Sequence, residues 1–92
     1  MITTSVRIKK PSIKTTRIAE KNVLGYAYQN DFEIEIDPRQ SSKEYFNTCI
    51  HECFHIWFPD LKEKHIIRLS DMLSEILWRR GYRRVSKGNV VK

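Results

Sequence analysis

SSKEYFNTCIHECFHIWF, residues 41–58, is the stretch that decides the fold. Ser41 and Ser42 are good N-caps, so we predict a helix from Lys43 to Phe58, which Pro59 and Asp60 end. At about 100° per residue, apolar side chains fill most of the circumference of this helix. The remaining polar arc is narrow and consists of Asn47, Thr48, His51, Glu52 and His55. The helix should therefore be largely buried, with its polar groups gathered in one place.

The polar arc contains the pattern His-Glu-x-x-His, formed by His51, Glu52 and His55. Histidines four residues apart lie one helical turn apart on the same face, so both imidazoles can bind one ion. A bound zinc ion lowers the pKa of its water, and the glutamate after the first histidine is placed to take the proton. We predict that His51 and His55 bind one zinc ion and that Glu52 is the general base. The alternative is that both histidines are only the exposed stripe of an amphipathic helix.

A second helix is predicted from Leu61 to about Arg80. Asp60 and Glu63 have the capping-box spacing at its start, and Gly81 is a normal C-terminal glycine. The two helices should form a hairpin. Its apolar residues predict one buried stripe, made of Ile66, Leu69, Leu73, Ile76 and Leu77.

A catalytic zinc also needs a third protein ligand. Asp71 and Glu75 fall far from the predicted buried stripe and should face water. Glu63 lies in the first turn after the tight connection and can fold back beside the first helix, so we predict it as the third ligand. Capping is its alternative role. His65 is the alternative ligand, because all three histidines lie within fifteen positions.

A half-buried strand is predicted before the first helix. Phe32, Ile34 and Ile36 alternate with acidic residues, which is the two-residue period of a strand. Turn residues at 30–31 and 37–38 bound it.

Two further segments complete a predicted sheet. Residues 2–9 alternate weakly, and Gly25 in the next apolar stretch suits a bend or a close backbone approach. The first forty residues thus predict a small antiparallel sheet of about three strands. We expect an α+β fold in which this sheet packs on the two-helix hairpin, as one domain over 1–84 with a flexible tail over 85–92.

The chain resembles the zincin superfamily of HExxH metallopeptidases, in particular small phage-type members. The resemblance runs roughly from Gly25 to Arg84 and rests on five segments: GY at 25–26, FEIEIDPR at 32–39, NTCIHECFH at 47–55, FPDLKE at 58–63 and LWRRGYRR at 77–84. It implies a zinc peptidase acting on a peptide or protein substrate. In that superfamily the strand before the active-site helix is a sheet edge that pairs with substrate, a role that would fall to Phe32, Ile34 and Ile36. Phe58 and Leu61 replace the glycine and histidine of the metzincin pattern, which excludes that class.

The net charge of +6 favours acidic partners. Arg79, Arg80, Arg83 and Arg84 form a basic cluster with aromatic neighbours, so nucleic-acid contact is a second hypothesis. A third is a non-catalytic phage-type binding or inhibitor module with a structural or vestigial metal site.

No membrane span and no signal-peptide pattern is found in the sequence, and we expect a cytoplasmic protein, in the host cytoplasm if it is phage-encoded, rather than a secreted one. The only two cysteines, Cys49 and Cys53, lie four apart on one helix face and are expected to be reduced.

Overall fold

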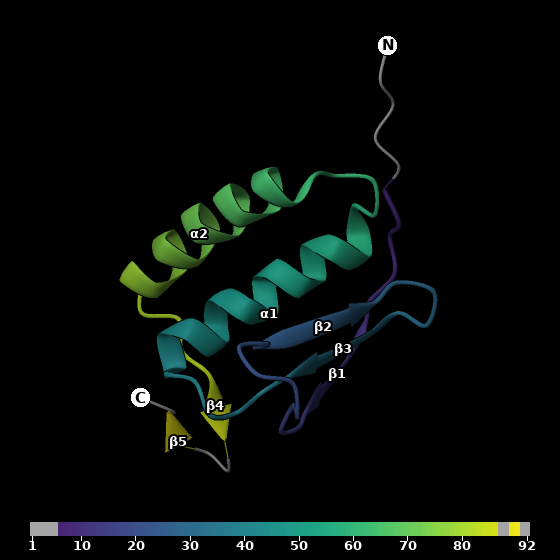
Figure 1. The fold of residues 1–92 in the computed structure, drawn as a ribbon. Coiled ribbons are helices and arrows are strands. Elements are labelled where there is room, and N and C mark those ends of the chain that lie inside the picture. Colours follow the sequence, from purple (N-terminus) through teal and green to yellow (C-terminus); the bar gives the residue numbers. More distant parts are fainter. Residues whose placement is uncertain (1–5, 87–88, 91–92) are drawn as a thin grey trace.

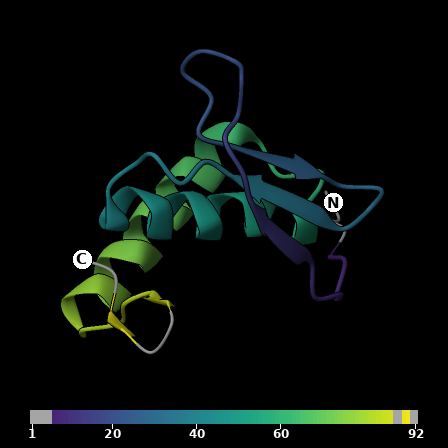
Figure 2. The same cartoon turned by 90° about the horizontal axis from the view of Figure 1, so that it is seen from below.

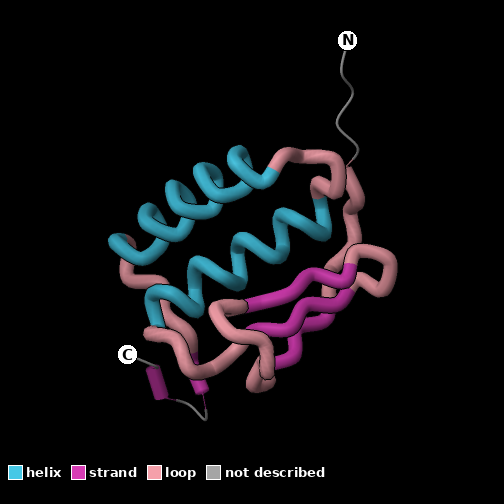
Figure 3. The backbone as a smooth tube through the Cα atoms, viewed as in Figure 1, coloured by secondary structure: helices cyan, strands magenta, loops and turns pink. Residues whose placement is uncertain are grey.

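Two helices and three strands form three layers in the computed structural model, which describes residues 6–86 and 89–90. The strands are β1 (Ser12–Thr15), β2 (Gly25–Tyr28) and β3 (Glu33–Ile36), and the helices are α1 (Ser42–Trp57) and α2 (Glu63–Arg79). Within the described residues α1 contacts β2, β3 and α2, whereas α2 contacts none of the three strands. The central helix therefore lies between the sheet and the outer helix (Figure 1), and both helices lie on one side of the strands (Figure 3). This confirms the predicted α+β class.

The sheet is mixed, which corrects the prediction of an antiparallel sheet. Its order is β1-β3-β2, with β2 antiparallel and β1 parallel to β3. β2 and β3 form the hairpin expected from the turn at 30–31. β1 and β2 lie at opposite edges of the sheet, because the 16–24 connection between them crosses from one edge to the other. β3 then pairs between the two.

The first strand also lies later than predicted. Residues 2–5 are outside the described part of the chain, and residues 6–11 form no strand. Instead, this segment is bound to the end of α1: Arg7 N donates to the Trp57 carbonyl at 2.8 Å, and Trp57 Nε1 donates to the Lys9 carbonyl at 2.9 Å. Backbone groups used in this way cannot form a ladder with a strand.

The apolar core lies between β3 and α1. Ile34 and Ile36 of β3 and Ile56 of α1 are fully buried. The two-residue period of β3 brings both of its isoleucines to the α1 face, as the alternation predicted. Each fully buried isoleucine contributes about 1.5–3 kcal/mol to stability. Cys49 and Cys53, both free thiols, pack against this cluster.

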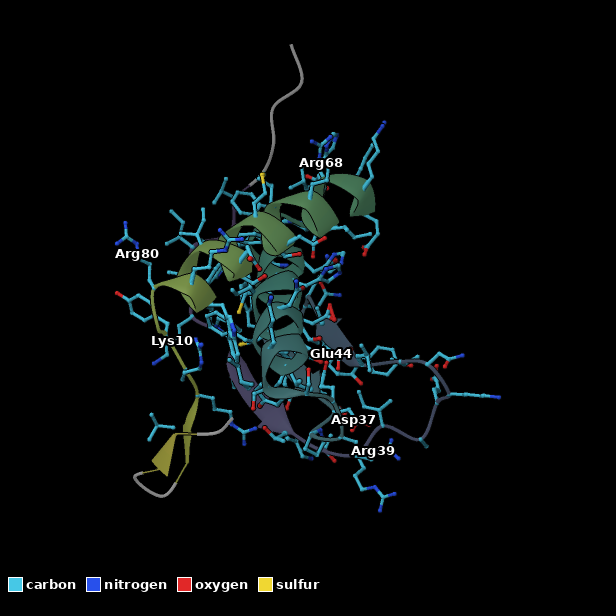
Figure 4. The ribbon with its side chains drawn as sticks, turned by 90° about the vertical axis from the view of Figure 1, so that its left-hand side faces the viewer. Lys10, Asp37, Arg39, Glu44, Arg68 and Arg80 are labelled. Atoms are coloured by element: carbon cyan, nitrogen blue, oxygen red, sulfur yellow. The ribbon has the colours of Figure 1, made fainter. Side chains whose placement is uncertain are left out.

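A buried carboxylate fixes the end of β3. Asp37 accepts hydrogen bonds from Ile18 N and Arg39 N, both at 2.9 Å, and pairs with the Arg39 guanidinium at 2.6 Å. The Arg39 hydrogen bonds and the two backbone donors hold the Asp37 pKa well below its usual range. Figure 4 shows Asp37 and Arg39 together near the start of α1. This contact ties the 16–24 connection to the end of the sheet.

α1 begins and ends within one residue of its predicted bounds. Ser41 Oγ accepts from Glu44 N at 3.2 Å and the Glu44 carboxylate accepts from Ser41 N at 3.1 Å, which is a complete capping box. The capping box predicted for α2 is wrong. α2 begins at Glu63 after Lys62, which makes no side-chain cap. The Glu63 carboxylate is used elsewhere, as described below.

The buried face of α2 differs from its predicted stripe. Ile66 is buried as expected, but its companions are Ser70 and Ser74, while Leu69, Leu73 and Ile76 are exposed. The helix is turned by roughly 70° about its axis relative to the prediction. The reason is that the α1 face beneath it is polar, so polar side chains of α2 find partners there.

Residues 85–92, predicted to be a flexible tail, include two short paired strands, β4 (Val85–Ser86) and β5 (Asn89–Val90). They lie beyond the end of α2 and apart from the three-stranded sheet (Figure 2). Residues 87–88 and 91–92 are outside the described part of the chain, so flexibility of this segment stays a prediction.

Candidate metal centre

The two histidines of α1 lie side by side on the face that α2 covers. His51 Nε2 and His55 Nε2 are 3.2 Å apart, and both side chains are half-buried. The predicted one-turn spacing has therefore placed two imidazole nitrogens at one point. The ligand atoms of His51, Glu52 and His55 lie within 4.8 Å of one another, so this group could hold a metal ion.

Glu63 brings a third donor group to the same point. Its Oε1 is 2.9 Å from His51 Nε2, and its Oε2 is 2.7 Å from His55 Nε2. Glu63 reaches the histidines because it is the first residue of α2, directly after the short connection that reverses the chain. The predicted fold-back of Glu63 onto the end of α1 is therefore present.

The donor set and its spacing fit a small divalent ion. Two imidazoles and one carboxylate are the ligand types of many catalytic zinc sites. At zinc–ligand distances near 2.0–2.1 Å, tetrahedral ligands lie about 3.3 Å apart. The observed separations of 2.7–3.2 Å among His51, His55 and Glu63 are slightly shorter, as expected of atoms in hydrogen-bond contact. An ion would need only a small outward movement of these groups.

Glu52 lies beside this cluster and is almost fully enclosed, with 7% of its surface exposed. Burial, and secondarily the negative charge of Glu63, raise the pKa of Glu52 to about 7. A carboxyl group with a pKa near neutrality can both accept and return a proton at physiological pH, which is what a general base requires.

The surroundings of His55 shift its pKa downward, toward the neutral form. Burial lowers the pKa of His55, and the neighbouring His51 acts in the same direction, although the Glu63 carboxylate opposes both. A neutral imidazole has a lone pair on one ring nitrogen that can bind a metal, whereas the doubly protonated ring has none. The backbone at this position is also fixed, because Gln29 Nε2 donates to the His55 carbonyl at 2.9 Å.

Ser70 on α2 was not identified from the sequence, yet it contacts His51. Its Oγ lies 3.4 Å from His51 Nδ1 and donates to the Ile67 carbonyl at 3.1 Å. Because the hydroxyl donates to Ile67, the Oγ can accept a hydrogen bond from a protonated His51 Nδ1. When a metal binds at His51 Nε2, the ring proton lies on Nδ1, and Ser70 is placed to accept its hydrogen bond. The available signal was the spacing of Ser70 and Ser74, two small polar residues one turn apart on α2.

Gly25 lets β2 approach the site. A side chain at this position would place its Cβ 2.8 Å from Thr48 Cγ2, which is closer than packing allows, and 3.2 Å from Glu52 Cγ, which is tight. The close backbone approach predicted for Gly25 is therefore confirmed. A cleft of about 460 Å³ begins here, lined by Gly25 and Thr48 and by His51, Glu52 and Ile67.

The predicted substrate strand is wrong. β3 is central and hydrogen-bonded on both sides, and Ile34 and Ile36 point into the core. Phe32 precedes the strand, in a turn, with φ of 50°. The alternation of apolar residues indicated burial correctly, but it cannot show which strand lies at an edge. The edge beside α1 is β2.

The other candidate ligands lie away from the histidine pair. His65 is exposed on the opposite side of α2 from Glu63, because two residues correspond to about 200° around a helix. Asp71 accepts a hydrogen bond from Asn47 at 2.8 Å, and Glu75 pairs with Lys43 at 3.1 Å. Both acids thus bind α1 further along the helix pair.

Three arginines of the C-terminal cluster have partners within the chain. Arg79 pairs with Glu75 at 2.7 Å, the Arg83 guanidinium lies 3.5 Å from the centre of the Trp78 ring, and that of Arg84 lies 4.3 Å from the Tyr45 ring. These contacts close the end of the helix pair, and nucleic-acid contact stays a prediction. No helix in the described residues is long and apolar enough to cross a membrane.

No protein-family model, curated protein or solved structure matches this chain. An assignment of function must therefore come from the arrangement of its own residues.

Proposed function

We propose that this chain is a zinc-dependent metallohydrolase of zincin type whose substrate is a peptide amide. The observation that carries the proposal is the convergence of His51, His55 and Glu63 within 2.7–3.2 Å, with the buried Glu52 beside them. A cluster of metal-ligand side chains beside a buried carboxyl group with a raised pKa is the arrangement that a hydrolytic metal site requires.

Each residue of the site has one task in this proposal. His51, His55 and Glu63 would hold the ion, and Ser70 would accept the hydrogen bond of the Nδ1 proton of a His51 ring that binds the ion through Nε2. When bound, zinc supplies a Lewis acid that polarises the substrate carbonyl and acidifies water. Glu52 takes the proton of the attacking water at its carboxylate and later passes it to the leaving amine nitrogen.

The substrate would lie along the cleft between β2 and the helices. β2 is an edge strand next to α1, so an extended peptide can add to its free side by main-chain hydrogen bonds. The cleft beside Glu52 shares Leu24, Asn47, Thr48 and Asp71 with a second hollow of about 420 Å³. Together they offer room for side chains on one side of the scissile bond.

Metal content tests the ligand set. Purified wild-type protein should bind one zinc per chain, and His51→Ala and Glu63→Ala should each lose it, as measured by plasma mass spectrometry after dialysis against a weak chelator. His65→Ala is the matched control, because it removes the third histidine and should keep the zinc. Wild-type protein without zinc, or loss of zinc in the control alone, would contradict the proposal.

A second set of variants tests catalysis. Glu52→Gln keeps the size of the side chain but cannot accept a proton, so it should retain zinc and cleave a quenched-fluorescence peptide library about 10²–10⁴-fold more slowly. Equal cleavage by both proteins would remove Glu52 from the mechanism.

A structural metal site is the second candidate, and one observation favours it. Glu63 joins the start of α2 to both histidines of α1, so an ion here would also clamp the two helices together. In that case zinc would bind and stabilise the fold, and neither wild-type protein nor Glu52→Gln would cleave any peptide of the library.

A further inference from the structure

The outer face of α2 carries an exposed apolar stripe. Leu69, Met72, Leu73 and Ile76 are between 37% and 57% exposed. Their spacing is i, i+3, i+4 and i+7, so they lie together along one side of the helix. Side chains of this kind on the free face of an outer layer mark an interaction surface.

The stripe faces outward because the polar residues of α2 are used on the inside. All three acidic residues of the helix bind α1: Glu63 contacts the histidines, Asp71 accepts from Asn47, and Glu75 pairs with Lys43. Turning the helix to bury the stripe would break every one of these contacts. The contacts of these acids with α1 therefore fix the rotation of α2 that leaves the stripe exposed.

The shape of this face suits another helix. A hollow of about 460 Å³ is lined by Leu61 together with His65, Arg68, Leu69 and Met72. The last four stand at i, i+3, i+4 and i+7, which is the set of residues that forms one hole for a side chain of a facing helix. Leu69, Met72, Leu73 and Ile76 have the same spacing and provide the next hole along the helix.

The charges around the stripe are basic. Arg68 and Arg80 project from α2 away from α1 (Figure 4), and Lys64 lies on the same side as Arg68. Because the acids of α2 are bound to α1, this surface attracts a helix with acidic flanks. A second copy is disfavoured, because it would bring two chains of net charge +6 together at the same basic face.

We propose that the outer face of α2 is the docking site for an amphipathic helix of a partner protein. That helix would carry apolar residues at heptad spacing and acidic residues beside them. A membrane surface is the less favoured occupant, since the apolar arc spans only roughly 100° of the helix, the width of a helix–helix seam. The site is separate from the metal centre and does not rest on the proposed hydrolase activity.

The probe is a synthetic peptide of about three heptads with Leu at the a and d positions and Glu at e and g, compared with its Lys counterpart. The acidic peptide should bind, with amide shift changes confined to residues 61–80, and the Lys peptide should bind at least about tenfold more weakly. Met72→Asp should weaken binding of the acidic peptide at least about tenfold. The matched control is Ile13→Asp on β1, because Ile13 is 49% and Met72 53% exposed, and it should bind like wild type.

A second pair of variants tests the charges. Arg68→Glu should weaken binding of the acidic peptide several-fold at low salt, whereas Lys14→Glu on β1, with the same change in charge, should not. Circular dichroism, expected to be unchanged, shows that the variants are folded.

Four results would overturn the proposal. In the first two, the acidic peptide does not bind, or it binds Met72→Asp as well as wild type. In the third, sedimentation shows a dimer that Met72→Asp abolishes. In the fourth, the protein binds phosphatidylserine vesicles in a Met72-dependent way but does not bind the peptide. The third would assign the face to a second copy of the chain, and the fourth to a lipid surface.

Discussion

The two sides of α1 contact very different neighbours. Toward the sheet, Ile56 packs on Ile34 and Ile36, and the contact is apolar and fully buried. Toward α2, His51 and Asn47 meet Ser70, Asp71 and other polar side chains through hydrogen bonds. The first interface supplies the stability of the domain, because burial of apolar surface is the dominant favourable term in folding.

The second interface, between α1 and α2, buries little apolar surface because polar side chains occupy it. Ile66 is the one apolar residue of α2 that is fully buried among the described residues. Phe46 of α1 and Trp78 of α2 also pack, with their ring centres 6.2 Å apart. The hydrogen bonds between the helices each add only about 0.5–1.5 kcal/mol. The apolar stripe of α2 is left in solvent as a result. Polar contacts and apolar burial thus lie on opposite sides of one helix.

Truncating the same residue type on the two sides should give the largest contrast. Ile34→Ala leaves a cavity in the fully buried core and should cost about 2–5 kcal/mol. Ile76→Ala on the outer face of α2, where the side chain is mostly in water, should cost less than about 0.5 kcal/mol. Urea denaturation followed by circular dichroism measures both. A similar cost for the two variants would mean that the α2 stripe is covered in solution.

The pH dependence of the metal-free protein probes the polar side. The Glu52 pKa is raised from 4.5 to about 7, so the folded state holds this proton where the unfolded state has lost it. Glu52 therefore contributes stability below about pH 4.5, and this contribution is lost as the pH rises through 7. His55, whose pKa is lowered, acts in the opposite sense, losing its contribution as the pH falls below 6.5.

Glu52→Gln isolates the first effect, since glutamine resembles the protonated acid at every pH. The variant should gain stability over wild type as the pH rises from 5 to 8, by at most about 3 kcal/mol. Thermal unfolding of both proteins in a chelating buffer measures the difference. A constant difference across this range would show that Glu52 is not buried as described.

The smallest effect on folding is expected at Ser70, where the readout is metal affinity. Ser70→Ala removes the acceptor for His51 Nδ1–H and should weaken zinc binding about 10–100-fold, with little change in the urea midpoint. Ser74→Ala makes the same change one turn further along α2, where the serine accepts from Asn47, and should leave zinc affinity as it was. Competition with a chromophoric chelator measures both. Equal losses would mean that general packing, and not the His51 tautomer, is affected.

Local rules predicted most of the secondary structure. The serine caps predicted where α1 begins, and the alternation of Ile34 and Ile36 predicted their burial, because caps and periodicity depend on neighbouring residues. They failed for β1, where the backbone of residues 7–9 is bound to the end of α1. They also failed for the sheet edge, because strand order depends on pairings between distant segments.

For the candidate site, the sequence by itself determined that His51, Glu52 and His55 share one arc of a helix, since a four-residue spacing fixes that geometry wherever the helix lies. Only the tertiary structure decided which face of α2 meets them. Helical phase favoured burying Leu69, Leu73 and Ile76, but the partner face is polar, and Glu63, Ser70 and Asp71 turn toward it. The orientation of a helix follows from both surfaces of the contact, and the sequence of one helix describes only one of them.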